Sequence, residues 1–150
     1  MSSNKHMTIA IAQADVPNLI GNIYTKEAIT KMYENAKEAI DKGFFGGELI
    51  HDASDRTYEN FSIDLSKVTH QVSRVDVVDG FLVADVEFMD TPHGEIARNL
   101  VESAAGVIRP TIAGTLDPIT KKITVSNVIS FDVIQYHDDF RLHVAWKQIK

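Results

Sequence analysis

The chain has 150 residues, 44% of them hydrophobic, which is enough for one globular domain that buries its own core. It contains no cysteine, which excludes thiol catalysis, zinc–thiolate sites and a disulfide scaffold. The formal net charge is -6 and the basic residues are scattered, so we expect no nucleic-acid partner. The apolar runs are short and residues 1–6 lack the apolar centre of a signal peptide, so we expect an intracellular protein with no membrane partner.

The N-terminal part of the chain predicts a strand followed by a helix. Residues 7–14 alternate loosely between apolar and polar types, and a turn rich in helix and strand breakers follows. Thr25 is placed to cap a helix that runs to Lys42, and Gly43 is placed to end it. The apolar residues of this helix recur at helical spacing, which is typical of a face packed on a core: Ile29, Met32, Tyr33, Ala36 and Ile40.

A short apolar segment punctuated by glycines, residues 44–51, predicts a strand that leads into the polar loop 52–64. A loop of that length in a compact domain is often functional or forms an interaction surface. Residues 66–78 and 81–89 then predict a hairpin, because Asp79-Gly80 between them is a strong signal for a two-residue turn.

Two features of the first hairpin strand are informative. The parity of its apolar positions changes along the strand, which predicts a β-bulge near Ser73-Arg74. His70 shares a face with apolar residues and is predicted to point inward. A single inward histidine is more often a core residue with satisfied hydrogen bonds than a functional group.

The second half of the chain predicts a helix and a second strand pair. Thr91 caps the helix, which runs to about residue 105 with Ile96, Leu100 and Val101 on its apolar side. Residues 107–116 and 123–136 pair around Asp117-Pro118, with an apolar face (Ile123, Val125, Ile129, Phe131, Val133) and a polar face (Thr124, Ser126, Ser130, Asp132). Residues 140–147 alternate as a further half-buried strand does, one that could dock on a neighbour.

Many strands with two helices between them predict an α+β domain, a small curled β-barrel of antiparallel strands with two flanking helices. Six segments, in this order, resemble the prohead maturation protease family of tailed bacteriophages. They are Asn18-Leu19-Ile20-Gly21-Asn22-Ile23-Tyr24, Gly47-Glu48-Leu49-Ile50-His51, Leu65-Ser66-Lys67-Val68-Thr69-His70, Asp90-Thr91-Pro92-His93-Gly94, Gly106-Val107 and Ser130-Phe131-Asp132-Val133-Ile134.

The resemblance implies a fold similar to that of the herpesvirus assemblins and one domain over 1–150. Residues 1–14 form an N-terminal arm and first strand, 15–136 the protease-like core, and 137–150 a C-terminal strand or arm. It also implies a histidine base, which His51 matches, for a serine carried on a Gly-Val-Ser-Ser-Arg-Gly segment. Here the chain departs from the family pattern, because Ile108-Arg109 or Arg109-Pro110 stands where the two serines should be.

The missing serine leads to our main hypothesis, because losing the nucleophile of such a unit costs on the order of a million-fold in rate. We expect a structural head protein, a decoration, cement or minor head component on an inactive fold. It would be present in many copies or as a homo-oligomer, bound to the major capsid protein in the virion, after assembly in the host cytoplasm. The loop 52–64 and the two ends of the chain would make the contacts.

Two alternatives remain open. In the first, the chain is an active maturation endopeptidase in which His51 is the base, Thr111 or a nearby serine (Ser126 or Ser130) is the nucleophile, and Asp132 or His70 orients the imidazole. In the second, His51, Asp52 and Asp55 bind a metal, although their spacing matches no established metal motif. Our main hypothesis includes neither a cofactor nor a metal.

Overall fold

The computed structural model describes residues 6–17, 21–50, 65–103 and 106–134. The elements in chain order are β1 (His6–Gln13), β2 (Ile23–Tyr24), α1 (Lys26–Asp41), β3 (Gly46–Ile50), the 3-10 helix η3 (Leu65–Lys67), β4 (Val68–Val78), β5 (Phe81–Phe88), α2 (Pro92–Glu102), β6 (Val107–Leu116) and β7 (Lys122–Ile134). This is an α+β fold in which the strands curl into a half-barrel, as the sequence predicts.

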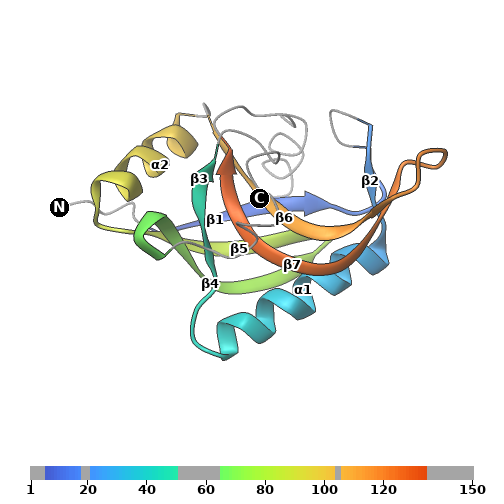
Figure 1. Cartoon of the computed structure of the whole chain (residues 1–150), viewed down its shortest axis with the longest axis horizontal. Helices are drawn as coiled ribbons and strands as arrows, with labels where there is room; N and C mark the ends of the chain where they lie inside the picture. Colours follow the sequence, from blue (N-terminus) through green and yellow to red (C-terminus); the bar gives the residue numbers. More distant parts are fainter. Residues whose placement is uncertain (1–5, 18–20, 51–64, 104–105, 135–150) are drawn as a thin grey trace.

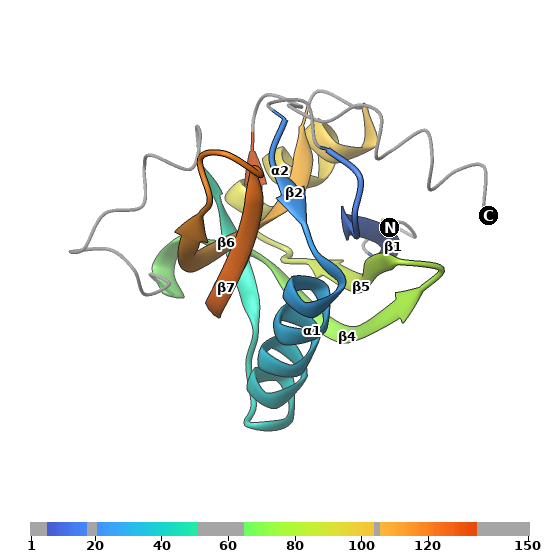
Figure 2. The ribbon, with the colours of Figure 1, turned by 90° about the vertical axis from the view of Figure 1, so that its right-hand side faces the viewer.

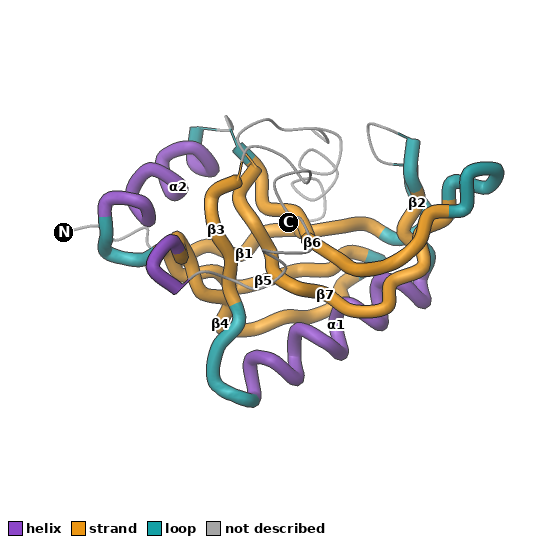
Figure 3. The backbone as a smooth tube through the Cα atoms, in the orientation of Figure 1, coloured by secondary structure: helices purple, strands orange, loops and turns teal. Residues whose placement is uncertain are grey.

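The sheet runs in the order β1-β5-β4-β3-β7-β2, and β6 pairs with β7. Figure 1 shows the strands bending around a common interior, with β1 and β6 close to each other. The expectation of purely antiparallel pairing is wrong in one respect, because both β2 and β3 pair with β7 in parallel. The sheet is therefore mixed, and the tube view of Figure 3 shows the strands as its dominant component.

Helix α1 begins and ends where the sequence predicts. The side chain of Thr25 accepts a hydrogen bond from the backbone of Ala28, which satisfies a free donor of the first turn. Gly43, just beyond the end of the helix, has φ +134, a backbone conformation that favours glycine. Figure 2 shows the helix lying between β7 and β4, and it packs against both strands. The α1 stripe therefore fills the space that the short strand β3 leaves between its longer neighbours.

Helix α2 has the predicted cap but a different buried face. The Thr91 side chain accepts a hydrogen bond from Gly94, and Pro92 opens the helix. The expected apolar side is partly wrong, because Ile96 is 52% exposed and the helix buries Ala97 and Val101 instead. The helix ends at Glu102, a few residues earlier than expected.

The β4–β5 hairpin confirms two sequence predictions. Its turn lies at Asp79-Gly80, where both residues have positive φ values of 51 and 83. The register shifts between Val72 and Arg74, which leaves Ser73 as the extra residue of the predicted bulge.

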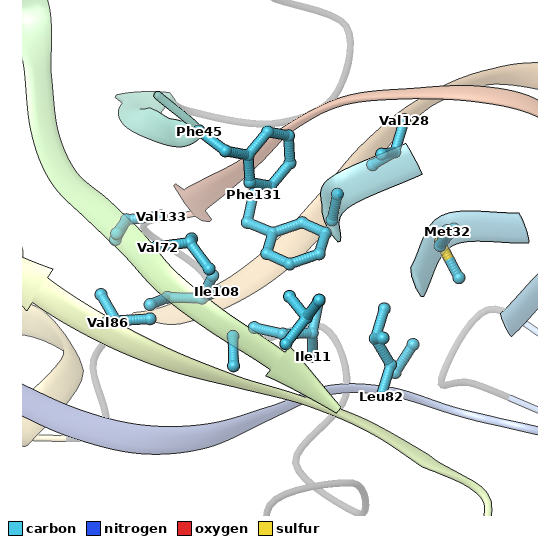
Figure 4. Packing of buried hydrophobic residues seen from close by; sticks show 14 of the residues in the cluster. Ile11, Met32, Phe45, Val72, Leu82, Val86, Ile108, Val128, Phe131 and Val133 are labelled. Atoms are coloured by element: carbon cyan, nitrogen blue, oxygen red, sulfur yellow. The ribbon is translucent and has the colours of Figure 1, made fainter. Parts of the chain in front are cut away.

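One cluster of buried side chains lies at the centre of the half-barrel and joins both helices to the curled sheet. Figure 4 shows its middle, where Phe45 meets Phe131 edge to face with ring centroids 4.9 Å apart. Ile108 of β6 belongs to the same cluster and is completely buried. The core therefore extends up to the β6–β7 pair, where the sequence places the candidate site.

Candidate functional site

The centre of the candidate site is the carboxylate of Asp132 on β7, which is completely buried. Ser130 lies two residues away on the same face, and Thr111 of β6 is the cross-strand partner of Ser130. Thr111 Oγ1 and Ser130 Oγ both donate to Asp132 Oδ2, the second over 2.7 Å. Asp132 Oδ1 accepts the backbone N–H of Glu48 over 2.9 Å. The structure thus brings together Thr111 and Asp132, two of the predicted site residues.

The polar face predicted for this strand pair exists, but it is not solvated at this end. Thr111 is 8% exposed, and Ser130 and Asp132 are fully buried. Buried polar groups are costly unless they are hydrogen-bonded, and each of these three side chains has a partner within the cluster. The cluster consequently works as a hydrogen-bonded tie between β3, β6 and β7.

The two glycines of β3 allow its neighbours to approach closely. A Cβ atom on Gly47 would lie 1.9 Å from the carbonyl oxygen of Phe131 and 2.9 Å from Asp132 Oδ1. A Cβ atom on Gly46 would lie 2.3 Å from the carbonyl oxygen of His70. Real Cβ atoms do not come so close to backbone atoms, so side chains at these positions would push the strands apart. The Gly46-Gly47 pair is therefore required by the packing of β3.

His70 of β4 points inward and is completely buried, as predicted. Its Nε2 lies 2.5 Å from the carbonyl oxygen of Phe131, and its Nδ1 lies 2.8 Å from Thr69 Oγ1. A carbonyl oxygen only accepts hydrogen bonds, so Nε2 carries the proton and Nδ1 accepts from the threonine. Burial lowers the pKa of His70 to about 4, although the Phe131 carbonyl and the Asp132 charge act in the opposite direction. The imidazole is neutral at pH 7 and both of its nitrogens are occupied.

The sequence reasoning missed the hydroxyl of Thr69, which is the hydroxyl that contacts the His70 imidazole. Its position next to an inward histidine was the signal that could have identified it. A threonine bonded to a histidine resembles a nucleophile with its base. Thr69 is, however, completely buried, so the pair has no surface from which a substrate could be attacked.

The other half of the predicted unit, His51, lies outside the described residues, as do Asp52 and Asp55 of the metal hypothesis. The strand that leads to His51 is described as far as Ile50, which pairs with Ile134, and Val107 of β6 pairs with the same Ile134. Thr111 is four residues further along β6, about 13 Å at the usual rise of a strand.

The two residues at the first of the serine positions offer no nucleophile. Ile108 is completely buried in the core, and Arg109 is half-buried with its guanidinium donating to the Ile108 carbonyl oxygen over 2.9 Å. Of the remaining hydroxyl candidates, Ser126 is exposed at a second register shift of the β6–β7 pair, away from the Asp132 cluster. Neither a hydrocarbon nor a guanidinium can act as the nucleophile of acyl transfer.

Within the described ranges, no group of three or more metal-binding side chains occurs, and no helix is long and apolar enough to cross a membrane. The described site is thus a buried arrangement of protein groups around Asp132 and His70. Its chemistry is hydrogen bonding between strands.

The fold and the site define an α+β half-barrel with a mixed sheet and two helices, with a buried Asp132 cluster beside the glycine-narrowed strand. No protein-family model matches the chain, and no curated protein does either. Among solved structures, the chain resembles the capsid assembly protease of bacteriophage T4, gp21. The TM-score is 0.64 at 12% sequence identity, and the match covers 86% of this chain and 80% of that chain. The similarity supports a prohead-protease-like fold.

Proposed function

We propose that this chain is a structural protein of a phage head, built on a prohead-protease-like fold without proteolytic activity, and that it binds the lattice of the major capsid protein. The similarity of fold to a capsid assembly protease supports the connection with phage heads. We propose the virion as its location, following assembly in the host cytoplasm.

The observation that carries the proposal is the burial of Ile108 at one of the two alternative positions for the family's serine. This side chain is 0% exposed and contacts the core, so the position has become part of the hydrophobic interior. The nearest hydroxyl along β6, Thr111, donates to Asp132. A threonine that holds two strands together through a carboxylate stabilises the fold without any need for turnover.

The first experiment measures binding and cleavage in the same sample. The purified chain is mixed with capsids assembled from the major capsid protein of the same phage and then sedimented. We expect the chain to sediment with the capsids at a fixed stoichiometry, while neither capsid nor scaffold protein is shortened. Absence from sedimented capsids at saturating concentration would contradict the binding proposal.

A second candidate function, an active endopeptidase, has one contact in its favour. Thr111 and Ser130 donate to the buried Asp132 carboxylate, and a hydroxyl near a carboxylate is one component of a hydrolytic site. In this alternative, His51 is the base and Thr111 the nucleophile.

Three variants separate the two functions. The endopeptidase hypothesis requires that cleavage of scaffold protein survive in Thr111→Ser, which keeps a hydroxyl, and disappear in Thr111→Val and His51→Ala. The structural hypothesis requires that all three variants leave capsid and scaffold proteins intact, as the unmodified chain does. Far-ultraviolet circular dichroism of each variant confirms that a loss of cleavage does not reflect unfolding.

A further inference from the structure

The far end of the β6–β7 hairpin is a preorganised turn. Asp117 Oδ1 accepts the backbone N–H groups of Ile119 and Thr120 over 2.8 and 3.1 Å. The backbone closes the turn, because Lys121 N–H donates to the Asp117 carbonyl oxygen over 2.8 Å. The β2 strand braces its base, where Ile23 N–H donates to the Lys121 carbonyl oxygen over 2.8 Å. The turn therefore holds a defined shape.

At the tip of this turn, Ile119 is 89% exposed, and we name this side chain the knob. The other exposed large apolar residues of the described ranges are only 41–52% exposed. Single exposed aliphatic residues are ordinary on protein surfaces. The knob differs because a hydrogen-bonded turn presents it in one position, so binding it in a partner costs little conformational entropy.

The opposite end of the molecule has a pocket of about 260 Å³, which we name the socket. Its described walls combine apolar and polar side chains: Phe44, Val68 and Met89, with Ser66, Thr91 and His93. Small-molecule sites usually measure about 300–1,000 Å³, so the socket is better suited to a single side chain. Its apolar walls match a branched aliphatic group.

The knob and the socket lie at the two ends of the longest axis of the molecule. In Figure 1 the β6–β7 turn extends to the far right, whereas η3 and the start of α2, which carry socket residues, lie at the left. The knob of one molecule therefore cannot reach its own socket. It can reach the socket of a second copy.

We propose that copies of this chain associate head to tail, with Ile119 of one copy seated between Phe44, Val68 and Met89 of the next. The proposal does not depend on the capsid function. A head-to-tail contact uses different surfaces on the two copies and can repeat. One side chain buries far less area than a stable interface needs, so each contact is weak and gains strength from repetition.

The contact is apolar rather than ionic. The charged residues that adjoin the socket lining in sequence, Lys67 and Asp90, have opposite signs. They offer no net charge to the two lysines, Lys121 and Lys122, that follow the knob. We therefore expect the association to change little between low and moderate salt.

The absence of native cysteines makes cross-linking a direct test. Thr120→Cys places a thiol beside the knob, and Ser66→Cys places one in the socket wall. The two proteins are mixed at high concentration, one of them with a mass tag, and oxidised mildly. We expect the mixed disulfide to exceed either homodimer by about tenfold or more, from the burial of one isoleucine side chain.

Two further variants in the Thr120→Cys protein control for chance encounters. Ile119→Asp should reduce the mixed disulfide to the homodimer level. Val77→Asp, which changes an exposed aliphatic residue on the β4–β5 hairpin, should leave it unchanged. Equal amounts of mixed and homodimeric species, no cross-link at the highest soluble concentration, or insensitivity to Ile119→Asp would each overturn the proposal.

Discussion

The imidazole of His70 on β4 donates to the backbone carbonyl oxygen of Phe131 on β7, across the strand that separates them. The residue of β3 that pairs with His70 is Gly47, and a Cβ atom there would collide with the same carbonyl oxygen. The histidine and the glycine thus depend on each other. This contact ties the two halves of the curled sheet together and leads to the first two predictions.

The stability of the protein should depend on pH through His70. Its pKa is about 4 in the folded chain and about 6.5 in an unfolded one, so the unfolded state binds more protons between these values. The stabilising contribution is complete above pH 6.5 and is lost as the pH falls toward 4, by up to about 3 kcal/mol. Urea unfolding at a series of pH values measures this change. His70→Gln, which keeps a donor without titrating in this range, should flatten the dependence, and an unchanged slope would contradict our assignment.

Gly47→Ala should destabilise the fold by about 3 kcal/mol or more, because the added methyl group meets backbone atoms that cannot move aside. Gly106→Ala is the matched control, since its Cβ atom would lie 3.1 Å from the nearest backbone oxygen, and it should cost only about 1 kcal/mol. Thermal unfolding of the two variants decides the point. Equal losses would show that close packing at Gly47 is not the cause.

Asp132 should be replaceable by asparagine but not by alanine. Asp132→Ala leaves the Thr111 and Ser130 hydroxyls and the Glu48 N–H without their acceptor, and should cost about 2–5 kcal/mol. In Asp132→Asn, the amide oxygen can still accept from Glu48 and the amide nitrogen can donate to the rotated hydroxyls, so about 1 kcal/mol is expected. Chemical denaturation at pH 7 compares them. A stable alanine variant would show that the cluster contributes little.

Ile108→Ser should neither create a protease nor fold as well as the natural chain. The substitution removes buried hydrocarbon and adds a hydroxyl in the core, at a cost of about 3 kcal/mol. Ile119→Ser makes the same chemical change at an exposed site and should cost within about 0.5 kcal/mol. Denaturation and a scaffold-cleavage assay on both variants provide the test. Cleavage gained by Ile108→Ser would indicate that the catalytic machinery is intact.

Local patterns in the sequence predicted much of the fold because they depend on neighbouring residues. Thr25 and Gly43 bound the first helix as expected, and the change of parity around Ser73-Arg74 correctly predicted the bulge in β4. Ile96 shows the limit of such patterns. A helix of eleven residues accommodates more than one apolar stripe, and contacts with distant strands decide which one is buried.

The candidate site was harder to predict because distant segments build it. The sequence indicated that His70 points inward and that Ser130 and Asp132 share a polar face. It contains no local signal that the Phe131 carbonyl accepts from His70, since that contact spans 61 residues. Parallel pairing of β3 with β7 likewise depends on how the chain returns over a long separation, which no short window contains.

Strand β3 changes partner within five residues, since Gly46 to Glu48 pair with β4 whereas Leu49 and Ile50 pair with β7. If the chain carries mechanical load in a shell under internal pressure, tension between β4 and β7 passes through this short segment. The β3–β7 seam, with two residue pairs in register, is then where the protein should tear first when pulled in a single-molecule experiment.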